Sequence, residues 1–280
     1  MLGSIGGSWI GNVKRSNWNS ADTLVILDLS LATMAAEAHS KETAKTMAFC
    51  TTHWSVVLQA SDADGPKAHA ALERLCQTYW YPLYACVRRH GYGSEDACDL
   101  TQEFFARLLS KNSLRHADQR RGRFRTFLQT ALTNFLATEW AKGTAKKRGG
   151  GQEVLSLDAN EAEERYVAEP ADTLTPEKLF EQRWAATVLE LAVQNLAREY
   201  TAAGKAGLFE SLKNYIWGDG AASYAEIAAA HAMSEGAVKV AAHRLRERYR
   251  ELLLAEVGRT VASREEADDE LRHLISIVSG

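Results

Sequence analysis

The sequence predicts an all-α protein with two helical domains joined by an acidic flexible linker. Three observations support this fold class. Only four prolines occur in 280 residues, and the helix-forming residues Ala, Leu, Glu and Arg are abundant. From Trp54 onward, apolar residues recur at steps of three and four, the spacing of one face of an α-helix. The length also suffices for two domains of roughly 100–200 residues each.

The overall composition excludes several classes of protein. Hydrophobic residues make up 46% of the chain and charged residues 25%, which is typical of folded domains and not of disordered chains. The four cysteines lack C-x-x-C spacing, and no paired-histidine motif accompanies them. This argues against a zinc site and a disulfide framework, and favours reduced thiols in the cytoplasm. No segment reaches the ~20 apolar residues of a membrane helix. The net charge of −3 means that a nucleic-acid surface requires local segregation of charge.

Residues 1–46 are rich in Gly, Ser, Asn and Thr and precede the first strongly patterned segment. Their apolar run at 23–36 follows two basic residues and weakly imitates a signal peptide, but nothing downstream has an extracellular character. We expect residues 1–46 to be a disordered extension, or to precede a true start at Met47.

Helices are expected next within residues 47–148. One covers 68–89, is amphipathic, and contains Pro82, which should kink or divide it. Another covers 95–109, with a serine N-cap before it and carboxylates in its first turn. A third covers 123–142 and is followed by a basic run and three glycines.

The acidic linker is placed at 149–179. Residues 152–181 contain nine carboxylates against two basic residues, and Pro170 and Pro176 interrupt regular structure. A second helical domain is expected at 180–257. An acidic tail at 258–280 should end in an amphipathic turn or two.

The strongest functional pattern is a predicted helix-turn-helix. Ser223 would cap a short helix, a break follows at 231–234, and Ser234 would cap a longer helix. In this motif the N-terminal residues of the second helix reach base edges, while Arg and Lys further along neutralise phosphates. An ordinary helical hairpin with a solvated basic face is the alternative. The solvent face of the second helix would present Glu235, Lys239, His243, Arg244, Arg246, Arg248 and Arg250.

A second pattern combines basic and aromatic residues. Between positions 119 and 148, eight Lys or Arg residues stand against one carboxylate, Glu139, and four aromatic residues are interleaved. Cations hold phosphates and exposed rings stack on unpaired bases, so this mixture suits single-stranded nucleic acid. A core helix with solvated charges beside it is the alternative. Of the aromatic residues, Phe124 and Trp140 are expected to be the more exposed.

An acidic row is formed by Asp96, Asp99 and Glu103, which are spaced to share one helix face. Such a row can bind a divalent metal, as in a nuclease, but no histidine or second carboxylate cluster completes the site. A solvated or protein-docking face fits better, and no catalytic site or cofactor is expected. No Ser-His-Asp or Cys-His arrangement is evident, and single histidines are more often structural. Examples are His53, His69 and His90.

Four motifs follow one another along the chain: YPLYA at 81–85, EDACDLTQEFFARLL at 95–109, GRFRTFL at 122–128, and the predicted helix-turn-helix at 223–250. In order and spacing they resemble the extracytoplasmic-function (ECF) group of bacterial sigma factors, within the sigma-70 superfamily. The resemblance spans about residues 49–277. The ECF-like sets of planctomycetes also share LSLD at 155–158 and ADTLTPE at 171–177.

This resemblance implies a non-catalytic subunit that binds the β′ and β subunits of core RNA polymerase, directs the enzyme to specific promoters and helps to melt them. Residues 47–148 would be sigma region 2, and residues 180–257 would be region 4. An anti-sigma factor or another regulator is a further candidate partner. Because the chain departs from the family pattern in its N- and C-terminal extensions, either extension is also a candidate regulatory segment. The alternative is a helix-turn-helix regulator that binds duplex DNA without polymerase and has no use for a melting segment.

The resemblance also implies three groups of contact residues. The first would bind core polymerase: Asp96, Asp99, Leu100, Gln102, Glu103 and Phe105. The second would recognise and melt the minus-ten element: Arg123, Phe124, Arg125, Asn134, Trp140, Lys146, Lys147 and Arg148. The third would bind the minus-thirty-five element: Ser234, Glu235, Gly236, Lys239, His243, Arg244, Arg246 and Arg248.

Overall fold

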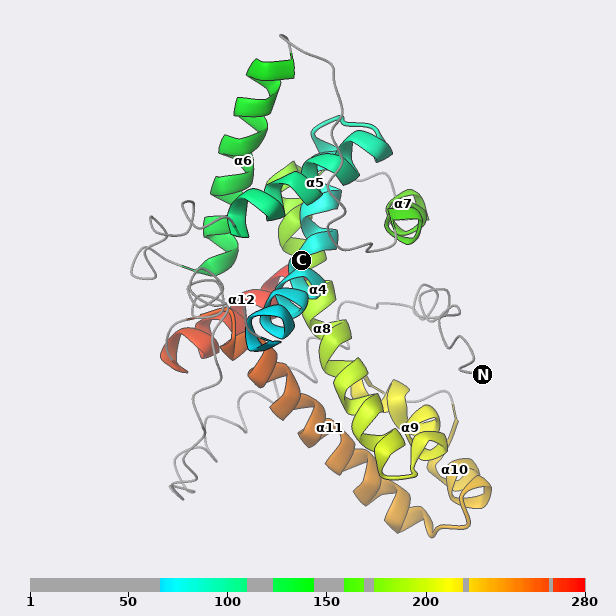
Figure 1. Cartoon of the computed structure of the whole chain (residues 1–280). Helices are drawn as coiled ribbons and strands as arrows, with labels where there is room; N and C mark the ends of the chain where they lie inside the picture. Colours follow the sequence, from blue (N-terminus) through cyan, green and yellow to red (C-terminus); the bar gives the residue numbers. More distant parts are fainter. Residues whose placement is uncertain are drawn as a thin grey trace.

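A computed structural model describes residues 66–109, 123–143, 159–168, 174–218, 222–261 and 264–279. Within these ranges every regular element is helical and no strand occurs, which confirms the all-α prediction (Figure 1). The predictions made for residues 1–46, for a start at Met47, and for Lys146, Lys147 and Arg148 lie outside the described residues.

The N-terminal part consists of α4 (Pro66–Arg89), α5 (Ser94–Leu109) and α6 (Phe124–Gly143). The helix α4 continues through Pro82, so this proline does not divide it. After α4 the chain turns at Gly91, whose φ of 94° lies in the left-handed region that glycine adopts without a steric penalty.

The C-terminal part begins within the predicted linker. Its acid-rich sequence is partly helical, because α7 lies inside it, and the predicted acidic tail forms a helix of 16 residues, α12, where a turn or two was expected. The elements are α7 (Ala159–Ala168), α8 (Pro176–Ala202), α9 (Ala206–Leu212), the 3-10 helix η3 (Lys213–Ile216), α10 (Tyr224–Ala230), α11 (Glu235–Gly258) and α12 (Arg264–Ser279).

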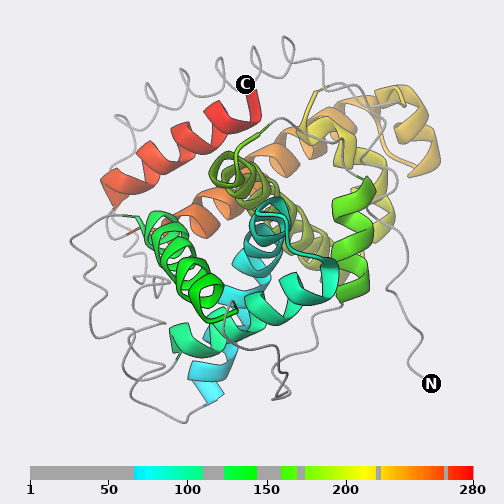
Figure 2. The same cartoon turned by 90° about the horizontal axis from the view of Figure 1, so that it is seen from above.

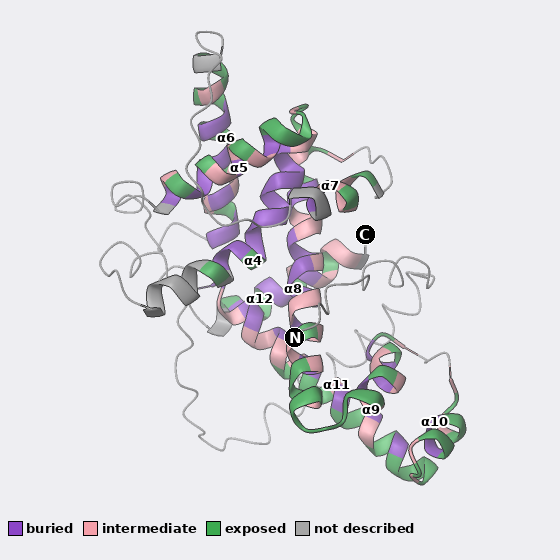
Figure 3. Cartoon of the chain, turned by 45° about the vertical axis from the view of Figure 1, so that its right-hand side comes forward, coloured by how far each residue is buried: buried purple, intermediate pink, exposed green. Residues whose placement is uncertain are grey.

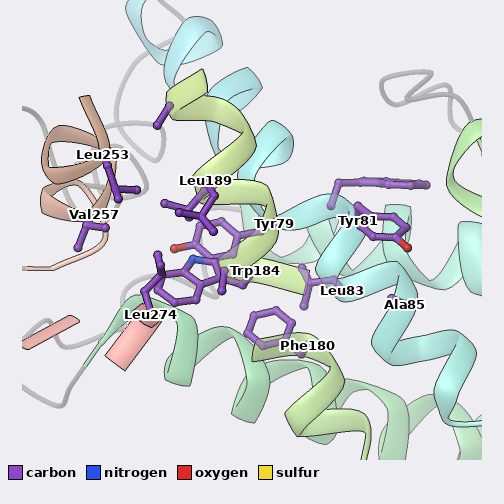
Figure 4. Packing of buried hydrophobic residues seen from close by; sticks show 14 of the residues in the cluster. Tyr79, Tyr81, Leu83, Ala85, Phe180, Trp184, Leu189, Leu253, Val257 and Leu274 are labelled. Atoms are coloured by element: carbon purple, nitrogen blue, oxygen red, sulfur yellow. The ribbon is translucent and has the colours of Figure 1, made fainter. Parts of the chain in front are cut away.

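The core is centred on the contact between α4 and α8, the most extensive of any helix pair in the described residues. Tyr79 of α4 and Phe180 and Trp184 of α8 are fully buried there (Figure 4). One cluster of buried side chains includes residues from α4, α5, α6, α8, α11 and α12. The hydrophobic core is therefore continuous from the predicted first domain to the predicted second domain.

Two ends of the molecule reach away from this core. Figure 3 shows buried residues concentrated in α4 and the adjoining part of α8, whereas the far end of α6 and the region of α10 are largely exposed. The helix α12 packs against both α8 and α11 (Figure 2). In the described part of the chain, no helix has both the length and the apolar character needed to cross a membrane.

Candidate nucleic-acid interface

The helices α10 and α11 begin where the sequence predicts. Ser223 and Glu226 form a reciprocal capping box at the start of α10. The hydroxyl of Ser234 accepts a hydrogen bond from the backbone N–H of Ala237, 3.2 Å away, at the start of α11. Both predicted N-caps are confirmed: Ser223 begins α10, and Ser234 ends the connection at 231–234 and begins α11.

The two helices are held together by their inner faces. Ile227 of α10 is buried, as are Val238, Ala242 and Leu245 of α11. These residues recur at steps of three and four along α11, so the opposite face of that helix is directed away from the core. This arrangement presents the first turns of α11 to solvent.

The exposed face of α11 contains most of the residues predicted for duplex DNA. Lys239, His243 and Arg244 are all exposed. The ammonium of Lys239 lies 2.8 Å from a carboxylate oxygen of Glu235, and this hydrogen bond raises the pKa of Lys239. Because both side chains are exposed, the pair contributes little stability and can be exchanged for a contact with phosphate.

The basic residues further along α11 are engaged within the protein. The carboxylate of Glu199 in α8 accepts two hydrogen bonds from Arg248, at 2.8 and 2.7 Å, and these bonds lower the pKa of Glu199. Arg248 also pairs with Glu251, and Arg250 pairs with Glu247. Arg246 is only partly exposed. The basic face predicted over the whole helix is therefore accessible mainly in its N-terminal half.

The outer end of α6 presents an aromatic side chain to solvent. Trp140 is 70% exposed, which confirms the prediction. Asn134, on the same helix, is also exposed. The prediction for Phe124 is wrong, since its side chain is fully buried and meets Tyr79 of α4 edge-on, with ring centroids 5.4 Å apart. Phe124 therefore packs in the core and does not present a ring for base stacking.

The two arginines at the start of α6 contact carboxylates from distant parts of the chain. Arg125 donates to Glu270 of α12 at 2.6 Å and to Glu181 of α8 at 2.5 Å, and its guanidinium lies over the ring of Trp184. Arg123 lies 2.8 Å from the other oxygen of Glu270. Arg125 is buried, and Arg123 is partly exposed. The prediction that Arg125 faces DNA is therefore wrong for this conformation of the chain.

This cluster gives stability a specific pH dependence through His273. Burial and the positive charge of Arg125 lower the pKa of His273. The unfolded chain therefore binds more protons between this lowered pKa and the ordinary histidine value of about 6.5, so stability is fully present above about pH 6.5 and falls as the pH decreases below it. As the pH is lowered below about 6.5, we expect the thermal unfolding temperature to fall less in His273→Gln than in the natural chain. The exposed His243→Gln is the control, and identical pH profiles for all three proteins would contradict the prediction.

The predicted polymerase-binding face of α5 is partly accessible. Asp96, Asp99 and Glu103 are exposed, and Glu103 forms an ion pair with Arg107 in the next turn. Phe105 is only 2% exposed, so its predicted contact with a partner is wrong. Its ring faces inward because the residue lies on the apolar face of α5. Leu100 and Gln102 are partly exposed.

No group of three or more metal-ligating side chains comes together in the part of the chain that the structure describes. Asp96, Asp99 and Glu103 of the acidic row lie on the exposed side of α5.

The sequence does not predict the positions of two residues, one on the exposed face of α11 and one in the core. Val240 is 50% exposed on α11, beside Lys239, and the sequence assigns it no contact. Glu270 lies in the acidic tail and is fully buried. The apolar residues Leu271 and Leu274 beside it were the only available signal that this tail docks on the protein.

Comparison of the chain with protein-family models, with curated proteins and with solved structures finds no match.

Proposed function

We propose that this chain is a promoter-specificity subunit of bacterial RNA polymerase, a sigma factor of the ECF type. The main support is the pair of capped helices α10 and α11, whose inner faces are buried while Lys239, His243 and Arg244 stay exposed. An exposed tryptophan at the far end of α6 provides a second, separate surface suited to an unpaired base.

The first turns of α11 would enter the major groove. Lys239 and Arg244 would neutralise phosphates or bind guanine edges, and Val240 offers an apolar contact for the methyl group of thymine. Trp140 would stack on a base of the opened strand. Opening costs a few kcal/mol per flipped base, and binding to the polymerase and to the duplex would offset this cost.

The acidic face of α5 would dock on the polymerase. Asp96, Asp99 and Glu103 are exposed and share one side of that helix, and complementary charge on a partner would speed and orient association. No covalent chemistry is required of the chain. Its role is to hold two DNA-binding surfaces at a fixed separation on the enzyme.

The test is transcription in vitro with purified core polymerase and a library of genomic promoters, together with co-elution of the chain and the core enzyme. The double variant Asp96→Asn/Asp99→Asn should lose co-elution. A matched control removes two exposed carboxylates from other helices, Glu73→Gln/Glu164→Gln, and should retain it. Absence of any complex between the natural chain and core polymerase would overturn the proposal.

Strand opening is expected to depend on Trp140. Loss of stacking on one base costs about 1–3 kcal/mol, so Trp140→Ala should reduce promoter opening by about 5- to 150-fold while leaving duplex binding unchanged. Permanganate reactivity of unpaired thymines measures opening, and filter binding measures the duplex complex. The control is Trp217→Ala, which removes another exposed ring. An equal loss of duplex binding in Trp140→Ala would contradict the assignment.

A helix-turn-helix regulator that binds duplex DNA without polymerase is the second candidate. The burial of Phe124 and the ion pairs of Arg125 favour it, because two residues assigned to melting are inaccessible in this conformation. Specific duplex binding by a chain that never co-elutes with core polymerase would support this candidate.

A further inference from the structure

Glu270 anchors the C-terminal helix α12 to the start of α6. Its side chain has no exposed surface, and its two oxygens face two arginines, Arg125 at 2.6 Å and Arg123 at 2.8 Å. A buried carboxylate is very costly unless it is paired and hydrogen-bonded. The position of Glu270 is therefore compatible with folding only while these arginines stay beside it.

A second carboxylate joins the contact from another helix. Glu181 of α8 accepts a hydrogen bond from Arg125 at 2.5 Å, and the guanidinium lies 5.3 Å from the ring centroid of Trp184. Arg125 thus links α6, α8 and α12 at one point.

Apolar packing supports the same placement of α12. Ala267, Leu271 and Leu274 are buried, and Leu274 lies beside Trp184 in the core (Figure 4). These residues and Glu270 recur at steps of three and four, so they share one face of the helix. The other face has exposed carboxylates, among them Asp268 and Asp269.

We propose that α12 is an autoinhibitory helix that competes with nucleic acid for Arg123 and Arg125. The inference rests on the proposed function, which assigns these two arginines to the minus-ten element. Carboxylates and phosphates occupy the same donor fork of a guanidinium. Contact of these arginines with DNA therefore requires α12 to leave, and the fraction of chains with α12 released limits the apparent DNA affinity.

The test compares two full-length variants that each remove one carboxylate charge from α12. Glu270→Gln removes the buried charge, and Asp268→Asn removes an exposed one. Hydrogen exchange of the α12 amides measures release of the helix, and fluorescence anisotropy measures binding of a labelled mixed-sequence single-stranded DNA. We expect Glu270→Gln to speed exchange in α12 and to tighten DNA binding about tenfold, within the range of ordinary coupling between sites. Asp268→Asn should leave exchange unchanged and alter affinity only slightly.

Leu274→Asn gives an independent route to release, because it disrupts the apolar part of the contact and leaves every charge in place. If α12 is released in either variant and DNA affinity stays at the level of Asp268→Asn, the inference is overturned. It is also overturned if α12 stays docked in Glu270→Gln, in Leu274→Asn and in the variant that combines them.

Failure of the inference can be separated from failure of the proposed function. If the natural chain co-elutes with core polymerase and release of α12 leaves DNA affinity unchanged, only autoinhibition is excluded. If the natural chain and every released variant bind neither core polymerase nor DNA, the proposed function fails, and the inference fails with it.

Discussion

Replacing Lys239 and Arg244 together with alanine is expected to weaken promoter binding by about 100-fold, since each lost phosphate or base contact costs on the order of 1–3 kcal/mol. Both side chains are exposed on the first half of α11. Each cation that neutralises a phosphate also releases counterions. The slope of the logarithm of affinity against the logarithm of salt concentration should therefore become shallower by about one unit for each residue removed. Titrations of labelled promoter duplex at several salt concentrations measure both quantities.

The matched control removes two other cations from the same helix. Arg248 and Arg250 are held in ion pairs with Glu199, Glu251 and Glu247, so Arg248→Ala/Arg250→Ala should weaken DNA binding much less. Binding to core polymerase should be intact in both double variants. Equal loss of DNA affinity in the two variants would show that the N-terminal half of α11 is not the DNA-reading surface.

Features that depend on neighbouring residues could be predicted from the sequence. The sequence predicts Ser223 and Ser234 as caps because a cap satisfies backbone donors only three residues away. The end of α4 near Gly91 could also be predicted, because glycine adopts the left-handed backbone conformation of this turn easily. The exposure of Trp140 fits its position on a stretch of α6 where few other residues are apolar.

Features that depend on partners from distant segments could not be predicted. The charge of Arg125 suggested an exposed cation, but its partner Glu270 lies 145 positions further along the chain. Burial of Phe124 requires Tyr79 of α4 beside it, and the periodicity of α6 alone does not show which helix will cover which face. The sequence predicts only an amphipathic turn or two for the acidic tail, because most carboxylates in proteins are exposed. The burial of Glu270 is recognisable only once α6 is placed.

The continuity of the buried cluster is the feature that bears most directly on the expected pair of domains. Trp184 of α8 has no exposed surface and lies beside Tyr79 of α4 and Leu274 of α12 (Figure 4). Trp184→Ala leaves a cavity at this junction and is expected to lower the free energy of unfolding by about 3–5 kcal/mol. This is a large fraction of the roughly 5–15 kcal/mol that stabilises a typical domain. The surface variant Trp140→Ala should change it by less than about 0.5 kcal/mol. Urea unfolding measures both values.

The helices that lose hydrogen-exchange protection in Trp184→Ala show whether the two halves of the chain fold as one unit. If the contact between α4 and α8 joins them into a single cooperative unit, Trp184→Ala should reduce the hydrogen-exchange protection of α5 and of α11 by the same free energy, because both then exchange through the same global opening. If the halves are independent domains, hydrogen-exchange protection should fall in the helices that surround Trp184. Of α5 and α11, the helix that belongs to the other domain should keep its protection unchanged. The second result would restore the two-domain organisation expected from the sequence, with the α4–α8 contact a docking surface between separate domains.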